Sequence, residues 1–184
     1  MRKILLTSSG FETKRITEIF LDLFGKAPAD IKALFIPAAA NFPAAVAVLP
    51  KCMDDLLNAG ILSENISVFD LHRNMEIDEL SNYDVIYFTG GSPRYLLERI
   101  NATGFNKSLI EYIDKGGVYV GVSAGSVVAA NNLPDSLNLI NCTLSVHMPC
   151  GTKSGIINVS ENPHIDLTDD RVILILDDKC EVLA

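Results

Sequence analysis

The stretch Gly117-Val118-Tyr119-Val120-Gly121-Val122-Ser123-Ala124-Gly125-Ser126-Val127-Val128-Ala129-Ala130 has a buried-strand pattern that runs directly into a helix start of small residues. A serine in such a turn adopts a strained backbone conformation that projects its hydroxyl clear of the sheet. The neighbouring glycines and alanine leave room that larger side chains would fill. Ser123 is therefore the leading candidate for chemistry. The competing interpretation is that Ser123 only caps the helix and that the glycines permit close packing.

Short apolar runs alternate with longer amphipathic segments on both sides of this stretch. Strands are predicted at 4–7, 31–36, 66–71, 85–89 and 118–121. This alternation favours a three-layer α/β fold with a doubly wound, mostly parallel sheet and helices on both faces. A run at 171–176, an Asp177-Asp178 turn and a last run at 181–183 predict a C-terminal hairpin at the sheet margin.

Two segments have clear helical periodicity. One carries an apolar stripe that ends at Gly25, formed by Ile16, Ile19, Phe20, Leu23 and Phe24. The other covers 44–59, where Pro50 is expected to kink or split the helix. Its predicted buried side is Met53, Leu56 and Leu57.

Composition narrows the class of protein. With 184 residues, 48% of them hydrophobic, the chain is expected to form a single domain over 1–184. A net charge of −8 without a basic cluster argues against nucleic acid or an anionic membrane as a partner. No apolar run reaches the roughly 18 residues of a membrane span, and polar residues end the first run too early for a signal peptide. Four scattered cysteines fit a reducing cytoplasm.

A second glycine turn, Thr89-Gly90-Gly91-Ser92-Pro93-Arg94, follows the preceding predicted strand. Ligand sites gather at the carboxyl ends of parallel strands, where both turns are expected. A backbone N–H of Gly90 or Gly91 is therefore expected to join that of Ala124 in an oxyanion hole. Helix entry, with Ser92 as N-cap, is compatible with this role.

Three histidines are available as a base for the serine. His147 ends an apolar strand pattern downstream of Ser123 and is the leading candidate. His72 and His164 are interpreted as solvated or packed side chains. Cys142, His147 and Cys150 do not match the spacing of a standard metal site, so no metal is expected.

Three pieces of the chain resemble peptidase family S51, the aspartyl dipeptidase and cyanophycinase group. They are Thr89-Gly90-Gly91-Ser92-Pro93-Arg94-Tyr95-Leu96-Leu97, Gly116-Gly117-Val118-Tyr119-Val120-Gly121-Val122-Ser123-Ala124-Gly125, and Leu137-Asn138-Leu139 leading into Val146-His147. The resemblance implies a class I glutamine amidotransferase-like fold and a serine peptidase with Ser123 as nucleophile and His147 as general base. It implies no metal or organic cofactor.

The chain departs from the family pattern in two places. Ser92 stands where the family usually has Asn, and Ser92 and Arg94 are the candidate substrate contacts. The segment 131–136, which usually carries the third, acidic member, is short and holds only Asp135. Glu161 and Asp166 are the alternatives to Asp135, which is otherwise a turn residue. Lys153 and Arg171 are further cations for an acidic substrate, although neither matches the family securely.

The leading functional hypothesis is hydrolysis of small peptides by a dipeptidase-like serine peptidase. Two alternatives stay open: a binding module with a vestigial site, and another serine acyl hydrolase such as an esterase or amidase. A small peptide is the expected partner, and exposed helix faces leave a homodimer open.

Overall fold

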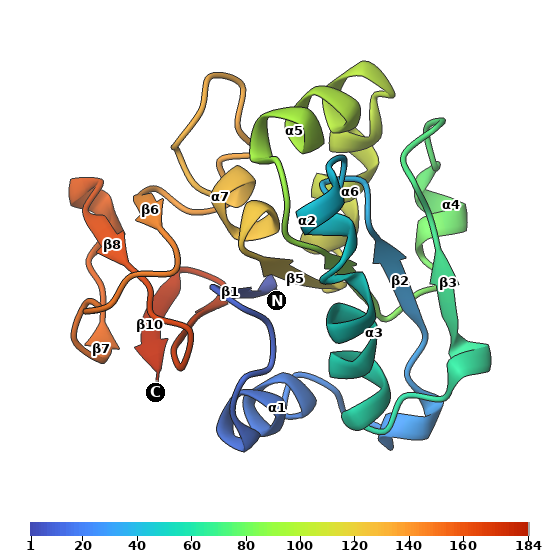
Figure 1. The fold of residues 1–184 in the computed structure, drawn as a ribbon, viewed down its shortest axis with the longest axis horizontal. Helices are drawn as coiled ribbons and strands as arrows, with labels where there is room; N and C mark the ends of the chain where they lie inside the picture. Colours follow the sequence, from blue (N-terminus) through green and yellow to red (C-terminus); the bar gives the residue numbers. More distant parts are fainter. Residues whose placement is uncertain (184) are drawn as a thin grey trace.

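The computed structural model describes residues 1–183 and has one large twisted sheet with a smaller sheet beside it (Figure 1). The order of the large sheet is β3-β2-β4-β5-β1-β9-β10-β7. Its strands are β1 (Lys3–Thr7), β2 (Ala33–Ile36), β3 (Ile66–Val68), β4 (Val85–Phe88), β5 (Val118–Val122), β7 (Gly155–Ile156), β9 (Val172–Leu176) and β10 (Lys179–Leu183). The small sheet pairs β6 (Thr143–Ser145) with β8 (His164–Asp166) in parallel. The mostly parallel α/β fold expected from the sequence is confirmed.

The parallel half of the large sheet brings three strand ends together. β1 pairs with β5 so that Thr7 faces Val122, and β4 pairs with β5 so that Phe88 faces Gly121. Every residue of β4 and β5 is buried, as expected for central strands covered on both faces. The residues that follow β1, β4 and β5 therefore meet at one edge of the sheet.

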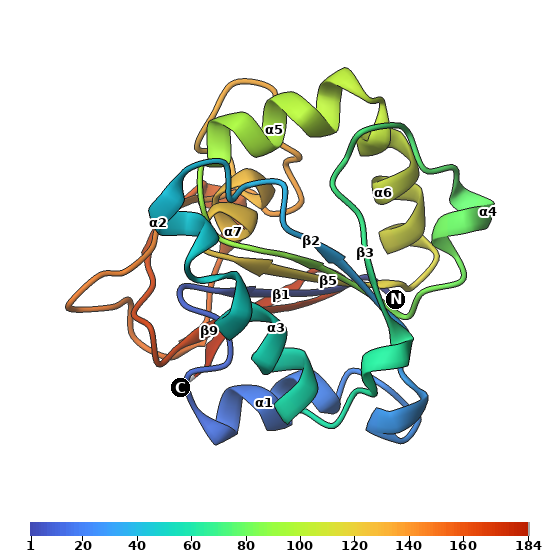
Figure 2. The ribbon, with the colours of Figure 1, turned by 45° about the vertical axis from the view of Figure 1, so that its right-hand side comes forward.

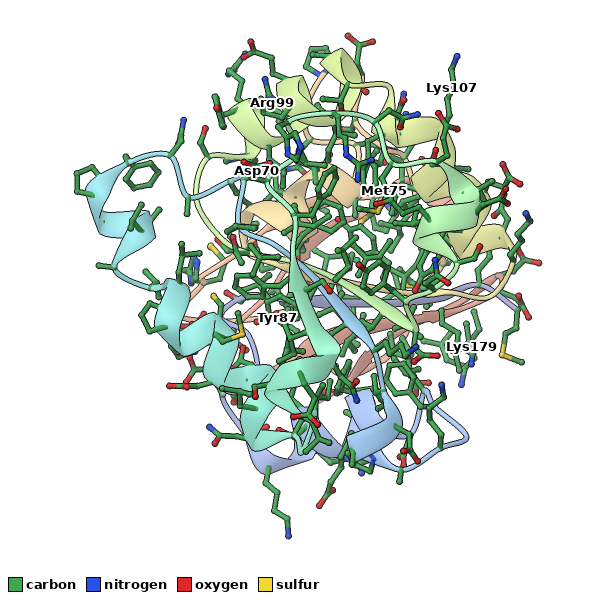
Figure 3. All side chains as sticks on the ribbon, turned by 90° about the vertical axis from the view of Figure 1, so that its right-hand side faces the viewer. Asp70, Met75, Tyr87, Arg99, Lys107 and Lys179 are labelled. Carbon is green, nitrogen blue, oxygen red and sulfur yellow. The ribbon has the colours of Figure 1, made fainter. Side chains whose placement is uncertain are left out.

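Helices cover both faces of the sheet (Figure 2). The helices are α1 (Lys14–Leu21), α2 (Pro43–Val46), α3 (Leu49–Asn58), α4 (Ile77–Leu80), α5 (Pro93–Ala102), α6 (Phe105–Asp114) and α7 (Ala124–Ala129). The apolar sides of α1 and α3 pack in one core cluster, and those of α5, α6 and α7 in another. Tyr87 belongs to the first cluster and Met75 to the second, and the two lie on opposite faces of the sheet (Figure 3). None of the described helices combines the length and the apolar character required to cross a bilayer.

The second helical segment is split in two near Pro50, which is one of the two outcomes expected from the sequence, a kink being the other. α2 ends at Val46, and Pro50 lies in the first turn of α3, where its missing N–H costs no helical hydrogen bond. Leu56 is fully buried, whereas the expectation for Leu57 is wrong because 38% of it is exposed on the outer side of α3. The resulting corner between α2 and α3 lies beside the strand ends described above.

The C-terminal hairpin forms as expected, from β9 and β10 joined at Asp177-Asp178. It does not form the margin of the sheet, because β7 pairs with the outer side of β10. β9 runs antiparallel to β1, with Val172 opposite Thr7. The chain just before β9, which includes Asp169, therefore arrives at the same edge as the end of β1.

Candidate active site

Ser123 occupies a strained turn between β5 and α7. Its backbone angles are φ 48° and ψ −102°, and its side chain makes no capping hydrogen bond to α7. The close packing around it explains the small neighbours. A Cβ at Gly121 would lie 2.7 Å from the carbonyl carbon of Gly125, and one at Gly125 would lie 2.7 Å from the Cβ of Phe88. The predicted order of strand, turn and small-residue helix is thus present, with the hydroxyl directed away from the helix.

His147 and Asp169 complete a line of hydrogen bonds with Ser123. The Oγ of Ser123 lies 3.0 Å from Nε2 of His147, and Nδ1 of His147 lies 2.9 Å from Oδ1 of Asp169. With Nδ1 protonated and donating to Asp169, Nε2 is left as the acceptor for the serine proton. The arrangement has the order of nucleophile, base and orienting acid found in serine hydrolases.

The small sheet carries the histidine and the acid together. His147 follows β6 and Asp169 follows β8, and these two strands pair in register, with Ser145 opposite Asp166. Two further backbone bonds extend the pairing, from Leu167 N–H to the Ser145 carbonyl and from Met148 N–H to the Leu167 carbonyl. The histidine therefore follows a strand of this separate sheet, whereas the serine follows a strand of the large one.

Ser8, fully buried at the end of β1, holds both members of this pair. Its Oγ donates to Oδ1 of Asp169 at 2.6 Å and accepts from the backbone N–H of His147 at 2.6 Å. His147 has a φ of 58°, in the left-handed region that non-glycine residues seldom adopt. The bond from its N–H to Ser8 stabilises this backbone conformation and ties the small sheet to the large one.

The surroundings of Asp169 favour its charged form. Partial burial raises the pKa of its carboxyl group, but the hydrogen bonds from Ser8 and His147 outweigh burial, and the pKa is lowered from its ordinary value of 3.8. His147 and the more distant Lys51 add favourable charge interactions. Asp169 is consequently a carboxylate at neutral pH, able to orient the imidazole and stabilise its protonated form.

The second glycine turn touches the first. A Cβ at Gly90 would lie 3.2 Å from the Cβ of Ser123, so the two turns are in van der Waals contact. Gly91 has a φ of 139°, and a side chain there would collide with the Ala39 carbonyl, so only glycine fits. Within 1–183 no protein acceptor takes the Gly91 N–H, and the Ala124 N–H opens α7, where helical partners are lacking. Burial raises the pKa of the Cys52 thiol, and the nearby backbone N–H of Gly90 opposes this rise.

A pocket of about 280 Å³ opens beside Ser123 and His147. One side is formed by the strand ends, at Ser8, Gly90 and Gly91, and the other by the corner between α2 and α3. A hollow of about 310 Å³ lies at the opposite, amino ends of the strands, near Lys3 and Val118, and contains none of the hydrogen-bonded groups described above. Of these two hollows, the pocket at Ser123 is therefore the one that lies against the hydrogen-bonded serine and histidine.

Asp135, the acid expected from the sequence, does not reach His147 and is replaced in that position by Asp169. Asp135 has a φ of 59°, accepts at its carbonyl from the Asn101 side chain, and lines a separate hollow against α5. It is a turn residue. The alternatives are also engaged elsewhere, Glu161 with Asn158 and Asp166 with His164.

The expected substrate contacts Ser92 and Arg94 do not line the pocket either. The Ser92 hydroxyl caps α5 by accepting from the Tyr95 N–H, and Arg94 lies in the hollow with Asp135. The first turn of α5 carries both side chains away from Ser123. His72 is exposed and paired with Asp70, so it has no part in the site.

Asp169 and Ser8 are the site residues that sequence reasoning missed. Ser8-Ser9, two polar residues directly after a buried first strand, were a usable signal for Ser8. Asp169 gave a weaker one, because its proximity to His147 depends on the pairing of β6 with β8, two strands of three residues each.

Comparisons with known proteins agree with this geometry. Residues 4–172 match the model of peptidase family S51. An uncharacterized peptidase of Listeria monocytogenes is 27% identical over 174 residues, covering 94% of this chain and 82% of that protein. Peptidase E of Streptomyces coelicolor is 28% identical, covering 89% of this chain and 64% of that protein. A crystal structure of a candidate peptidase E from Listeria monocytogenes has the same fold, with a TM-score of 0.77, 22% identity, and coverage of 100% and 98% of the two chains.

Proposed function

This chain belongs to peptidase family S51, and we propose that it hydrolyses short peptides with Ser123 as the nucleophile. The observation that carries the proposal is the continuous set of hydrogen bonds from Ser123 through His147 to Asp169. Membership in the family makes the protein a hydrolase, and the small pocket at Ser123 favours a substrate of a few residues over a folded protein.

In the proposed acylation step the Oγ of Ser123 attacks the scissile carbonyl while Nε2 of His147 removes the serine proton. The oxyanion of the tetrahedral intermediate accepts hydrogen bonds from the N–H groups of Gly91 and Ala124. His147 then transfers the proton to the leaving amine, and the C–N bond breaks to leave an acyl-enzyme on Ser123. Asp169 stays ionised and stabilises the imidazolium through both halves of the cycle.

Deacylation uses the same groups in reverse order. A water molecule gives its proton to Nε2 of His147 and attacks the acyl carbonyl, again with the oxyanion at Gly91 and Ala124. Collapse of this second intermediate returns the proton to Oγ of Ser123 and releases the carboxylic acid. Because Ser8 holds both the His147 backbone and the Asp169 carboxylate, it is a positioning residue that acts through this pair.

The contact between His147 and Asp169 bears on the first alternative, a vestigial binding module. That alternative is motivated by the short segment 131–136, which usually carries the acid, and Asp169 supplies an acid for His147 from another part of the chain at 2.9 Å. An esterase or amidase using the same serine remains the second candidate, since the same groups cleave esters more readily than peptides. Hydrolysis of unactivated peptides separates the two activities.

The first test is reaction of the purified protein with a small alkyl fluorophosphonate, followed by mass mapping of the modified peptide. We expect stoichiometric labelling at Ser123 that is abolished in Ser123→Ala and strongly slowed in His147→Ala. Ser92→Ala is the matched control, because it removes a serine at the adjacent turn and leaves Ser123 untouched. Folded wild-type protein that stays unlabelled, or that is labelled elsewhere, would contradict the proposal. A labelled enzyme that cleaves activated esters but no dipeptide would favour the esterase.

A further inference from the structure

The pocket beside Ser123 has one apolar wall, contributed by the corner between α2 and α3. Phe42, Ala45 and Val48 form most of it, and Leu49 and Ala44 extend it. Phe42 and Val48 leave 45% and 48% of their surface exposed, whereas Ala45 is buried against the core. Two large apolar side chains are thus exposed to solvent in the same pocket as Ser123, a feature typical of a binding surface.

From this wall we propose that the enzyme selects peptides with an uncharged, apolar side chain on the residue that supplies the scissile carbonyl. The inference rests on the proposed function, because it requires that Ser123 is acylated. The acyl carbonyl has to lie between the Ser123 hydroxyl and the Gly91 N–H, and the pocket extends from these groups to Phe42 and Val48. The side chain next to that carbonyl is therefore the part of the substrate that reaches the apolar wall.

The charges around the pocket argue against an acidic side chain. Lys51 is the cation among its described lining residues, and its Nζ is already held by the Glu12 carboxylate at 2.6 Å and by the Ser9 carbonyl at 2.7 Å. The hydrogen bond from Lys51 lowers the pKa of Glu12, so Glu12 is ionised at neutral pH. Glu12 and Asp169 interact unfavourably with each other, and an acidic substrate would add a third negative charge.

The other cations considered for an acidic substrate lie outside this pocket. Arg94 lines the hollow against α5, and the guanidinium of Arg171 donates to the Thr152 carbonyl. Lys153 is exposed and is not part of the described lining. A basic substrate side chain would lie next to the ammonium group of Lys51, which lines the pocket, whereas Glu12 and Asp169 are not among the described lining residues. An apolar side chain is the class that no charge at the pocket opposes.

The volume of the pocket sets the size of the side chain. About 280 Å³ holds one large side chain together with the peptide groups beside it. In a hydrophobic pocket, each methylene that fits is worth about 10- to 200-fold in kcat/KM. Substrates with leucine or phenylalanine in the acyl position are therefore expected to exceed alanine, and alanine to exceed aspartate and lysine.

The test compares aminoacyl amides that share one fluorogenic leaving group and differ only in the acyl residue: Leu, Phe, Ala, Asp and Lys. We expect kcat/KM for Leu or Phe to exceed that for Asp by about tenfold or more. Val48→Asp should abolish this preference, and stoichiometric labelling of Ser123 by the small fluorophosphonate shows that the variant is folded. Val46→Asp is the matched control, since Val46 is exposed to a similar extent, 49%, but does not line the pocket.

A second readout does not depend on turnover. The dipeptides Leu-Ala and Asp-Ala are compared for their ability to protect Ser123 from phosphonylation, and Leu-Ala should protect at the lower concentration. Equal protection, equal kcat/KM or a preference for Asp would overturn the assignment of the apolar wall and leave Ser123 as nucleophile intact. Absence of labelling at Ser123 would instead reject the proposed function itself.

Discussion

Ser92 and Ser123 stand at the same kind of junction, each between a buried parallel strand and the helix that follows it. β4 and β5 are neighbours in the sheet, so the two serines lie at adjacent strand ends. Ser92 has ordinary extended angles, φ −87° and ψ 110°, and its hydroxyl accepts from the Tyr95 N–H as a normal N-cap. Ser123 has φ 48° and ψ −102°, and its hydroxyl faces His147.

The difference teaches that backbone conformation determines which serine is available for chemistry. With extended angles, an N-cap side chain turns toward its own helix and satisfies one of the free N–H groups there. The strained angles of Ser123 direct the hydroxyl away from α7, and the Ala124 N–H, at the first helical position, has no helical partner. Gly121 and Gly125 make these angles attainable by letting the strand and the helix approach closely.

The largest expected effect comes from replacing Ser123 with alanine, and the same replacement at Ser92 is its control. Ser123→Ala should lower kcat by about six orders of magnitude, as loss of the nucleophile does in other serine peptidases, because no other hydroxyl faces His147 Nε2 in the described residues. Ser92→Ala should retain wild-type kcat/KM. Steady-state hydrolysis of a dipeptide measures both. If Ser123→Ala retained its turnover, Ser123 would not be the nucleophile, and the two serines would not differ in function.

Removal of the acid is expected to have the next largest effect. Asp169→Asn presents an amide to Nδ1 of His147 and favours the wrong tautomer, so kcat should fall by about four orders of magnitude. Asp135→Asn is the matched control and should leave kcat unchanged, since Asp135 lies in a separate hollow. Comparable losses in the two variants would indicate that the contact between Asp169 and His147 is not the functional one.

Ser8→Ala should lower kcat by about 10- to 100-fold, the range for a hydrogen bond to a charged group, with little change in KM. The reason is that the His147 N–H and one lone pair of Asp169 lose their common partner. Ser9→Ala serves as control, because the Ser9 hydroxyl interacts with Glu12 and not with Asp169. A rise in KM without a fall in kcat would show that Ser8 contacts substrate and does not act through His147.

The smallest effects concern stability and its dependence on pH. Ser92→Ala should lower the free energy of unfolding by about 1 kcal/mol through loss of the cap, equally at neutral and acidic pH.

The stabilisation lost in Asp169→Asn should depend on pH. Because the folded-state pKa of Asp169 lies below 3.8, its contribution is present above that value and disappears as the pH falls through the lowered pKa. Urea unfolding across this range compares the variants, and a pH-independent deficit in Asp169→Asn would contradict the lowered pKa.

The central sheet could be predicted from sequence because its signals are local. Runs such as Val85–Phe88 and Val118–Val122 are apolar throughout, and the glycine turns follow them directly. His147 could be predicted for the same reason, because it is a histidine just after an apolar run. Asp169 was not, because its neighbour is set by β6 and β8, which have three residues each and pair across 21 positions of sequence, Thr143 with His164. Short strands carry little periodicity, so the sequence offered Asp135, Glu161 and Asp166 as acids, and Asp169 is identified only by the tertiary structure.

Because the small sheet is attached to the large one at Ser8, we expect the enzyme to lose activity before it unfolds. The base and the acid are carried as one unit by β6 and β8, while the nucleophile belongs to the interior of the large sheet. A slight loosening of that unit would part His147 from Ser123 while the contact between His147 and Asp169 persists. Enzymatic turnover is thus expected to respond to a lower concentration of denaturant than circular dichroism does. Turnover depends on the contact between the two sheets, whereas the circular dichroism spectrum depends on the secondary structure within each sheet.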